Sequence, residues 1–301
     1  MKVGKVLYIR SKYSLNLKAG GSVAHTEGVI LSLNKQSQLD VYSNDHLNNI
    51  LPTIKIIKPI LKKVPIFNEL LYNFKVIRRL WTVKDYDFIY QRYSGESFNG
   101  AFLASKNKIP FILEFNSFDT WKIQNWPEKG SWLKLLIKKD LRLKIVRKIE
   151  NYNLKKASII VVVSDVLKDS LMQIGVPEKK ILVNPNGVNV EKFVDVSDSE
   201  IQELRTKLNL KDKIIFGFIG TFGQWHGVLE LAKSIVKFYD KYGDSKNKIR
   251  FLLIGDGFLM PEVKNILNNS NWNDKVILTG AIPQTQGPVH LKSCDYLLSP
   301  H

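Results

Sequence analysis

The fold is decided by a stretch that reads Ile214-Ile-Phe-Gly-Phe-Ile-Gly-Thr-Phe-Gly-Gln-Trp-His-Gly227, an apolar run followed by a glycine-rich turn that opens a helix. Near-continuous Val, Ile, Leu and Phe are typical of strands covered on both faces. Similar runs recur, with helical stretches between them, at residues 6–9, 39–43, 88–91, 111–115, 159–163, 250–254, 276–279 and 296–298. Strands that alternate with helices indicate βα units in parallel sheets, so the predicted class is α/β.

A polar stretch divides this series of strands into two groups. The turn-forming segment Pro185-Asn-Gly-Val-Asn189 is followed by a charge-rich segment at residues 195–213. Turn residues and charge between two apolar series are typical of a domain boundary. We therefore predict two domains, at residues 1–190 and 191–301.

The charge of the chain is distributed unevenly. Residues 1–190 hold 31 Lys and Arg against 15 Asp and Glu, whereas residues 191–301 hold 14 against 13. This asymmetry predicts that the first domain meets an anionic partner, which leaves nucleic acid, phospholipid headgroups and a polyphosphate ligand as alternatives.

The first ten residues resemble a strand more than a signal peptide. No run has the roughly 18 apolar residues of a membrane span, and Cys294 has no second cysteine to pair with, so a cytoplasmic protein is expected.

Glycine-rich turns follow three of the predicted strands. They are Gly20-Gly21, Gly220-Thr-Phe-Gly223 and Gly255-Asp-Gly257. Open parallel sheets bind ligands at the carboxyl ends of their strands, where backbone N–H groups can face a diphosphate. Each turn alone is also explained by the conformational freedom of glycine, but three together favour a nucleotide site. The absence of G-x-G-x-x-G and of G-x-x-x-x-G-K-[ST] disfavours nicotinamide or flavin enzymes and P-loop hydrolases.

Several motifs follow one another in the order and spacing of one enzyme family. The most specific group lies near the predicted boundary and reads Ile160-Val-Val-Val-Ser164, Gly175-Val-Pro177, Lys180-Ile-Leu-Val183 and Pro185-Asn-Gly-Val188. The others are Gly20-Gly21 with His25, Tyr90-Gln-Arg-Tyr93, Leu113-Glu-Phe-Asn116, Phe218-Ile-Gly220, Trp225-His-Gly227, Leu253-Ile-Gly-Asp-Gly257, Leu278-Thr-Gly-Ala-Ile-Pro283 and Asp295-Tyr-Leu-Leu-Ser-Pro300. In these motifs the chain resembles the retaining glycosyltransferases of family 4.

The resemblance implies a GT-B fold with two Rossmann-like domains. It also implies transfer of a sugar, with retention, from a nucleotide diphosphate sugar to a glycan or lipid-linked acceptor in cell-surface polysaccharide or glycolipid synthesis. Backbone dipoles at the departing diphosphate should supply much of the rate, and no metal or other cofactor is expected. The residues that the resemblance assigns to the donor are Gly20, Gly21, Gly220, Thr221, Phe222, Gly223, His226, Gly255, Asp256 and Gly257.

The chain departs from the family pattern in three places. The Arg and Lys that many members carry between Thr221 and His226 are missing, which leaves His226 as a weaker, pH-dependent donor. Asn116 stands where a histidine is frequent, so we assign no general base, and the acceptor-side candidates are Glu114, Asn116 and Asp119. The family motif of a Glu, seven residues and another Glu does not occur before His301. We therefore expect an incomplete second domain and little activity from this length of chain.

Two other classes of function are weighed against this one. Asp85-Tyr-Asp87 matches a metal-binding D-x-D, but it precedes a strand and would lie at the amino edge of the sheet. A non-catalytic module for anionic ligands or nucleic acid fits the charge, although the chain lacks basic motifs interleaved with aromatic residues, and no nucleic acid partner is expected.

A basic amphipathic helix is predicted at residues 132–149. If it lies on an anionic membrane, the enzyme would be peripheral on the inner face. If it packs on the sheet, its lysines would only face water. The residues expected to face the membrane are Lys134, Lys138, Lys139 and Arg142.

Overall fold

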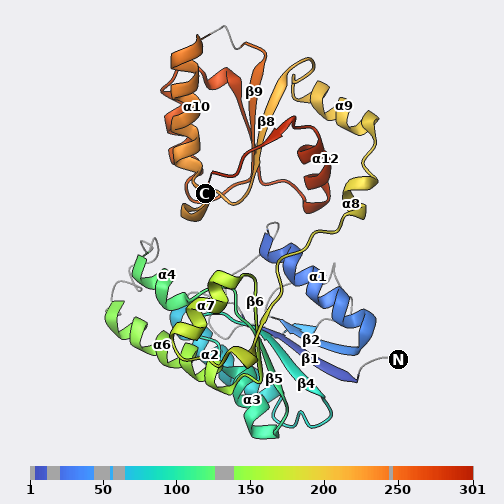
Figure 1. Ribbon diagram of the computed structural model, residues 1–301, viewed down its shortest axis with the longest axis vertical. Helices are drawn as coiled ribbons and strands as arrows, with labels where there is room; N and C mark the ends of the chain where they lie inside the picture. The colour runs from blue at the N-terminus through green and yellow to red at the C-terminus, as the bar shows by residue number, and fades with distance from the viewer. Residues whose placement is uncertain are drawn as a thin grey trace. The chain divides into compact units, whose positions relative to one another are not determined.

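The computed structural model describes residues 4–11, 21–43, 55–56, 65–125, 139–243 and 247–300. These residues form two compact α/β units, of which one holds His25–Asn186 and the other begins at Gly187 (Figure 1). Each unit has its own parallel sheet, so the predicted α/β class with two parallel sheets is confirmed. Among the helices in these ranges, none combines the length and the apolar character that crossing a membrane requires.

The first unit is built on a seven-stranded sheet of order β3-β2-β1-β4-β5-β6-β7. Its strands are β1 (Lys5–Arg10), β2 (Gln38–Ser43), β3 (Lys55–Ile56), β4 (Phe88–Arg92), β5 (Phe111–Glu114), β6 (Ile159–Val162) and β7 (Ile181–Val183). Its helices are α1 (Gly21–Gln36), α2 (Pro65–Arg79), α3 (Asn99–Asn107), α4 (Asp119–Asn125), α6 (Lys139–Lys156) and α7 (Asp165–Gln173), with a 3-10 turn at Glu178–Lys180.

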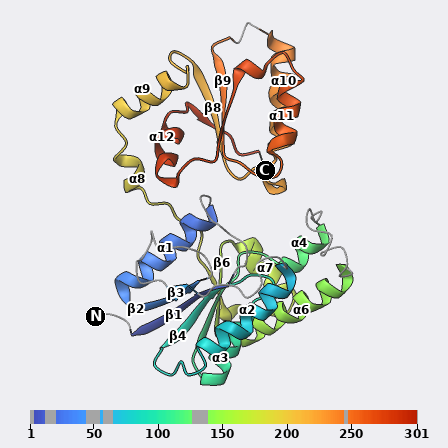
Figure 2. The ribbon, with the colours of Figure 1, turned by 180° about the vertical axis from the view of Figure 1, so that it is seen from behind.

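Both faces of this sheet carry apolar clusters. On one face, Ile30 of α1 packs with Val6 and Tyr8 of β1. On the other, α2, α3, α6 and α7 contribute side chains to a larger cluster with β1, β4, β5 and β6. Helices α2 and α3 lie side by side in this layer (Figure 2). The alternation of buried side chains along β1 and β4 thus supplies both faces, as expected for doubly covered strands.

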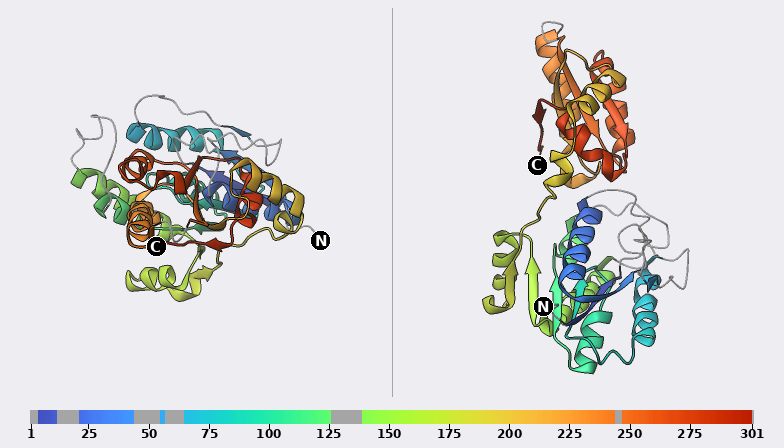
Figure 3. Two further views of the ribbon diagram at one scale, coloured as in Figure 1. Left: turned by 90° about the horizontal axis from the view of Figure 1, so that it is seen from above. Right: turned by 90° about the vertical axis from the view of Figure 1, so that its right-hand side faces the viewer.

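The second unit is built on a four-stranded sheet of order β10-β9-β8-β11, with β11 at its edge (Figure 3). Its strands are β8 (Ile214–Ile219), β9 (Ile249–Ile254), β10 (Val276–Gly280) and β11 (Tyr296–Leu297). Its helices are α8 (Glu191–Val194), α9 (Asp198–Lys207), α10 (Val228–Tyr242), α11 (Met260–Asn268) and α12 (Gly287–Lys292), with 3-10 turns at Gln224–His226, Asn273–Lys275 and Gln284–Gln286.

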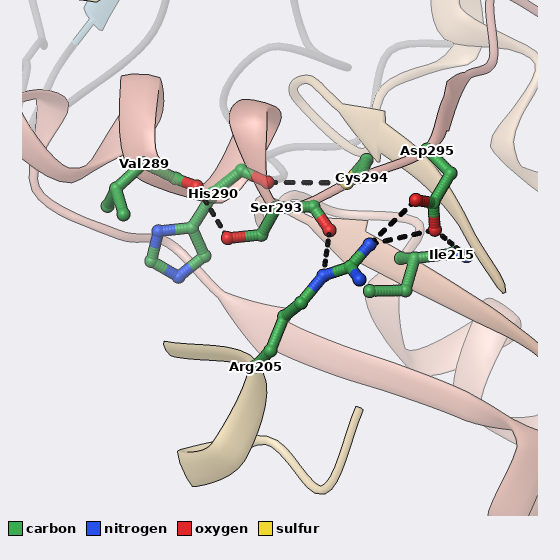
Figure 4. Close-up of polar contacts among 7 residues, drawn as sticks. All are labelled: Arg205, Ile215, Val289, His290, Ser293, Cys294 and Asp295. Atoms are coloured by element: carbon green, nitrogen blue, oxygen red, sulfur yellow. Dashed lines mark hydrogen bonds and ion pairs between the residues drawn. The ribbon is translucent and has the colours of Figure 1, made fainter. Parts of the chain in front are cut away.

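An arginine clamp ties α9 to the edge of this sheet (Figure 4). The Arg205 guanidinium donates to both carboxylate oxygens of Asp295 at 2.8 Å and to the carbonyl oxygen of Ser293 at 3.1 Å. The same carboxylate accepts the backbone N–H of Ile215, at 2.7 Å, from β8. Both carboxylate oxygens accept from the same nitrogen, Nη2, and charge-assisted hydrogen bonds of this kind are stronger than neutral ones. The clamp therefore joins α9, β8 and the start of β11 into one body.

Candidate functional site

Three charged side chains end adjacent strands at the carboxyl edge of the first sheet. Arg10 ends β1, Arg92 ends β4 and Glu114 ends β5. Arg10 pairs with Arg92 in the strand register, and Arg92 pairs with Glu114. Register partners in a parallel sheet point to the same face. The fold thus gathers two guanidinium groups and one carboxylate at the edge where α/β sheets bind ligands.

Glu114 is the centre of this cluster. Its Oε1 accepts a hydrogen bond from Asn116 Nδ2 at 2.6 Å and lies 2.9 Å from both His25 Nε2 and Arg92 Nη1. Its Oε2 accepts from Tyr90 Oη at 3.3 Å. Burial to 1% exposure would raise the pKa of Glu114. The hydrogen bond from His25, the charge of Arg92 and the Asn116 amide outweigh burial and hold that pKa below its ordinary value.

A carboxylate held in this way is an anchor more than an acid or a base. Its charged form is stabilised, so it is a poor proton donor at neutral pH, and its oxygens accept hydrogen bonds from Tyr90 and Asn116 and lie at ion-pair distance from His25 and Arg92. Its clearest physical effect is to orient the side chains of His25 and Arg92. Both side chains keep 17% of their surface exposed, so a ligand at this edge can reach them.

The remaining charge in the cluster is positive. Arg10 is buried and donates to Thr26 Oγ1 on α1. Tyr8 stacks on Tyr90 with ring centroids 5.5 Å apart, and burial raises its pKa, so the phenol adds no negative charge. Arg92 and His25 lie 2.9 Å from Glu114 and keep part of their surface exposed. Cationic donors in a partly buried site favour an anionic ligand.

The structure brings together two of the three acceptor-side candidates. Glu114 and Asn116 share a hydrogen bond, whereas the Asp119 carboxylate, at the start of α4, pairs with Lys122 at 2.6 Å. His25 and Arg92 were not among the predicted site residues, although both lie in motifs that carry the family resemblance. The available signal for His25 was its position one turn after Gly21, on the helix that follows the first glycine turn.

The two glycine turns of the second unit interlock through their backbones. Phe222 N donates to Asp256 O at 3.0 Å. A Cβ atom at Gly255, where φ is +134°, would lie 1.8 Å from Gly220 O, and one at Gly257 would lie 2.5 Å from Phe222 O. The packing of one turn on the other therefore accounts for Gly255 and Gly257, whether or not a ligand binds there.

The other donor-side candidates differ in what their side chains offer. Thr221 and Asp256 are exposed. Phe222 stays a predicted donor contact, and because its ring is 0% exposed in the core of the unit, only its backbone can offer that contact. The ring of His226 lies against Phe218 and Trp225, with centroids 6.2 and 5.8 Å apart.

The other predicted site residues belong to the glycine turns and to α6, or lie outside the described residues. Gly21 is the first residue of α1, and a Cβ atom there would meet open space. In the second unit, a Cβ atom at Gly223 would lie 2.8 Å from the Trp225 ring. Gly20, Lys134 and Lys138 lie outside the described residues. Lys139 is exposed on α6, and its Nζ donates to Gln124 O at 3.1 Å.

Arg142 has a structural contact that the amphipathic pattern does not predict. Its Nε lies 3.4 Å from Oε1 of Glu96, which is buried. The side chain of Arg142 is 20% exposed. An arginine that neutralises a buried carboxylate is engaged within the unit, because a buried charge without its partner is costly. Arg142 is therefore a weaker candidate for a membrane contact than the exposed lysines.

The D-x-D segment lies at the amino edge of the first sheet, as its position before a strand predicts. The backbone N–H of Lys5 donates to Asp87 Oδ2 at 2.6 Å, which ties the start of β1 to the residue before β4. Within the described ranges, no group of three or more His, Cys, Asp or Glu side chains is placed to hold a metal ion. The contact gives Asp87 a structural explanation.

Comparison with known proteins identifies a protein family that matches this chain. A sequence model described as Glycosyltransferase Family 4 matches residues 19–192. An uncharacterized glycosyltransferase of Methanocaldococcus jannaschii is 26% identical over 141 residues, which cover 47% of this chain and 34% of that protein. The alpha-monoglucosyldiacylglycerol synthase of Streptococcus pneumoniae is 23% identical over 207 residues, which cover 66% of this chain and 43% of that protein. The matches thus span less than half the length of these two relatives.

A solved structure shows the same fold over nearly the whole chain. HepE of Anabaena, crystallised in complex with UDP-glucose, superposes with a TM-score of 0.70 at 15% identity. The match covers 98% of this chain and 73% of that one. At this level of identity the likeness concerns the fold alone.

Proposed function

This chain belongs to glycosyltransferase family 4, and from that premise we propose that it transfers a sugar, with retention, from a nucleoside diphosphate sugar to an acceptor hydroxyl. The observation that carries the proposal is the cationic cluster at the carboxyl edge of the first sheet, in which Arg92 and His25 are anchored on the buried Glu114. The UDP-glucose in the HepE crystal supports a uridine nucleotide as the first donor to test.

The proposed chemistry depends on stabilising a leaving group. Negative charge grows on the diphosphate as the glycosidic bond breaks, so fixed cations and N–H dipoles lower the barrier. Arg92 offers a guanidinium held at 2.9 Å from its anchor, and His25 adds an imidazole held at the same distance. Because Glu114 already holds both side chains, they need little reorganisation when charge develops. No protein base is needed if the departing phosphate oxygen takes the acceptor proton.

Calorimetric titration of the 301-residue chain with UDP-glucose, GDP-mannose and ADP-glucose tests this proposal. We expect one of them to bind, and Arg92→Gln to weaken that binding at least about 10-fold, in line with the loss of a charge-assisted hydrogen bond. Arg147→Gln, an exposed arginine on α6, is the matched control and should bind normally. Circular dichroism establishes that each variant is folded.

Two outcomes would count against a glycosyltransferase. Folded protein that binds none of the three donors would overturn the proposal. Salt-dependent binding of an oligonucleotide in their place would favour the alternative of a nucleic-acid or anionic-ligand module.

The finer part of the proposal concerns the acceptor and the place of action. We propose a glycan or lipid-linked acceptor, met at the inner face of an anionic membrane to which the enzyme binds peripherally. Support comes from exposed cations along α6, which are Lys139, Lys144, Arg147, Lys148, Lys155 and Lys156. The name of the Streptococcus pneumoniae relative, a glycolipid synthase, points the same way. Each cation near an anionic leaflet contributes about 1 kcal/mol.

Sedimentation with lipid vesicles tests the membrane part. Vesicles with anionic lipid should carry down the chain at about 0.1 M salt, where screening is moderate, whereas neutral vesicles should not. Reversing two charges with Lys144→Glu and Lys148→Glu should abolish this binding. The control reverses Lys211 and Lys237, which are exposed in the second unit. Equal, negligible binding to both kinds of vesicle would show that the lysines only face water.

A further inference from the structure

A hollow of about 320 Å³ lies in the first unit, where β5 and β6 end and α4 and α7 begin. It is therefore at the ligand-binding edge of the sheet. Its wall is mainly apolar surface, although five of its ten lining residues carry a hydroxyl, amide or ammonium group. The lining residues are Asn116, Ser117, Phe118, Trp121, Lys122, Val163, Ser164, Val166, Leu167 and Ser170.

The apolar part of this wall is presented to solvent. Trp121 is 53% exposed and Val166 is 77% exposed, although both are large hydrophobic side chains. Covering apolar surface of this kind with a ligand removes it from water and therefore favours binding. Indole also offers a flat face on which an apolar ring face can lie.

The polar part of the wall offers hydrogen bonds but little free charge. Ser117 brings a hydroxyl group that can donate and accept, whereas the Ser170 hydroxyl donates to Val166 O at 2.8 Å and can accept a further hydrogen bond. The Lys122 ammonium is already paired with Asp119 at 2.6 Å. Oδ1 of Asn116 is buried and accepts no hydrogen bond from the residues that the structure describes. A hydrocarbon chain would leave these groups unsatisfied, at a cost.

The chemistry that satisfies both parts is a neutral pyranose ring. Such a ring has one face of C–H groups and a rim of hydroxyls, and it fits in a hollow of this size. Resting on the proposed glycosyltransferase function, we propose that this pocket binds a sugar residue of the acceptor, with its C–H face on the Trp121 indole and its hydroxyls on Asn116 and the serines. The acceptor class is then a glycan or a glycosylated lipid recognised through its sugar.

The wall that carries Trp121 is held in place without a ligand. Buried Glu150, on α6, accepts hydrogen bonds from Asp119 N at 3.0 Å and from Thr120 Oγ1 at 2.7 Å. Asn125 Nδ2 donates to the carbonyl oxygen of Trp121 at 2.9 Å. These bonds fix the first turn of the short helix α4. A preformed wall loses little conformational entropy on binding, which favours affinity for a small neutral ligand.

Saturation-transfer difference NMR tests the pocket, because it detects weak binding and identifies the ligand protons that touch the protein. The probes are the methyl glycosides of glucose, galactose, mannose and N-acetylglucosamine, together with octyl glucoside. We expect ring protons of at least one methyl glycoside to be saturated, and this signal to fall at least about 5-fold in Trp121→Ala. Trp121→Phe should retain an intermediate signal. Trp81→Ala, which removes a tryptophan of similar exposure on another surface, should retain all of it.

Donor binding separates this inference from the proposed function. Nucleotide-sugar affinity, measured by calorimetry, should stay within about 2-fold in Trp121→Ala, because the indole is a predicted acceptor contact only. If the chain binds a donor but no glycoside shows saturated ring protons, the proposed sugar pocket is wrong and the proposed glycosyltransferase function stands. Ring saturation that is unchanged in Trp121→Ala, or saturation confined to the octyl chain, also overturns it. Ring saturation that depends on Trp121, without donor binding, contradicts the proposed function alone.

Discussion

Replacing Glu114 by glutamine removes the negative charge on which the edge cluster is built. In the wild-type chain, Oε1 of Glu114 holds Asn116 Nδ2 at 2.6 Å and the cationic Arg92 Nη1 at 2.9 Å, with His25 Nε2 also at 2.9 Å. Glutamine preserves the shape of the side chain. The substitution therefore tests how much the charge of Glu114 contributes to stability, because the packing volume changes little.

The expected loss of stability is about 3 kcal/mol. Removing one partner from a buried ion pair costs about 3–5 kcal/mol, because the remaining charge stays desolvated. Arg92 and His25 are each 17% exposed, so water can partly solvate them and the lower end of that range applies. For a unit of this size, a loss of about 3 kcal/mol lowers the melting temperature by roughly 6–12 °C.

The pH dependence of this difference follows from the lowered pKa of Glu114. A carboxyl whose pKa is lower in the folded than in the unfolded state contributes its full stabilisation above the unfolded value, which is about 4.3. That contribution is lost as the pH falls through the folded value. The gap between wild type and Glu114→Gln should therefore be largest near pH 7 and should shrink below about pH 4.3.

Urea unfolding at several pH values, combined with hydrogen exchange, measures the effect. Exchange in peptides from β5 and α1 assigns it to the first unit. Glu178→Gln is the control, since Glu178 pairs with Lys168 at 2.6 Å but is 63% exposed, and it should unfold like wild type. Loss of one partner of a buried pair costs about 3–5 kcal/mol. A free energy of unfolding for Glu114→Gln within about 1 kcal/mol of the wild-type value at pH 7 would therefore refute the reasoning. A gap of the same size at pH 7 and pH 3.5 would do so as well.

Two further predictions concern the second unit. Gly255→Ala should destabilise it by at least about 3 kcal/mol in urea unfolding, because the new Cβ would lie 1.8 Å from Gly220 O and φ at +134° is strained for alanine. Gly187→Ala, where the Cβ meets open space, should change stability by less than about 1 kcal/mol; equal effects would contradict the interlocked turns. Arg205→Met should cost about 1–3 kcal/mol and speed hydrogen exchange in α9 and β11, since Asp295 loses both bonds at 2.8 Å. Unchanged exchange there would show that the clamp is not needed.

The sequence alone was enough to identify the α/β class, most of the strands and the family. These features are local, because an apolar run, a glycine turn and a helix are encoded within about 20 neighbouring residues. Nine predicted strands correspond to β1, β2, β4, β5, β6, β8, β9, β10 and β11. Strands β3 and β7, of two and three residues, were not predicted as strands.

The roles of individual side chains were decided by tertiary structure. Glu114 was predicted as an acceptor-side residue on its position alone, and only the fold brings it to within 2.9 Å of His25, far away in the sequence. Arg142 fits a membrane-facing pattern until its contact with the buried Glu96 is seen, and Phe222 lies in the core although it belongs to a predicted donor turn. A charge or a ring acquires its role from its burial and its partners. Those depend on which strands become neighbours and in what register, which no local pattern records.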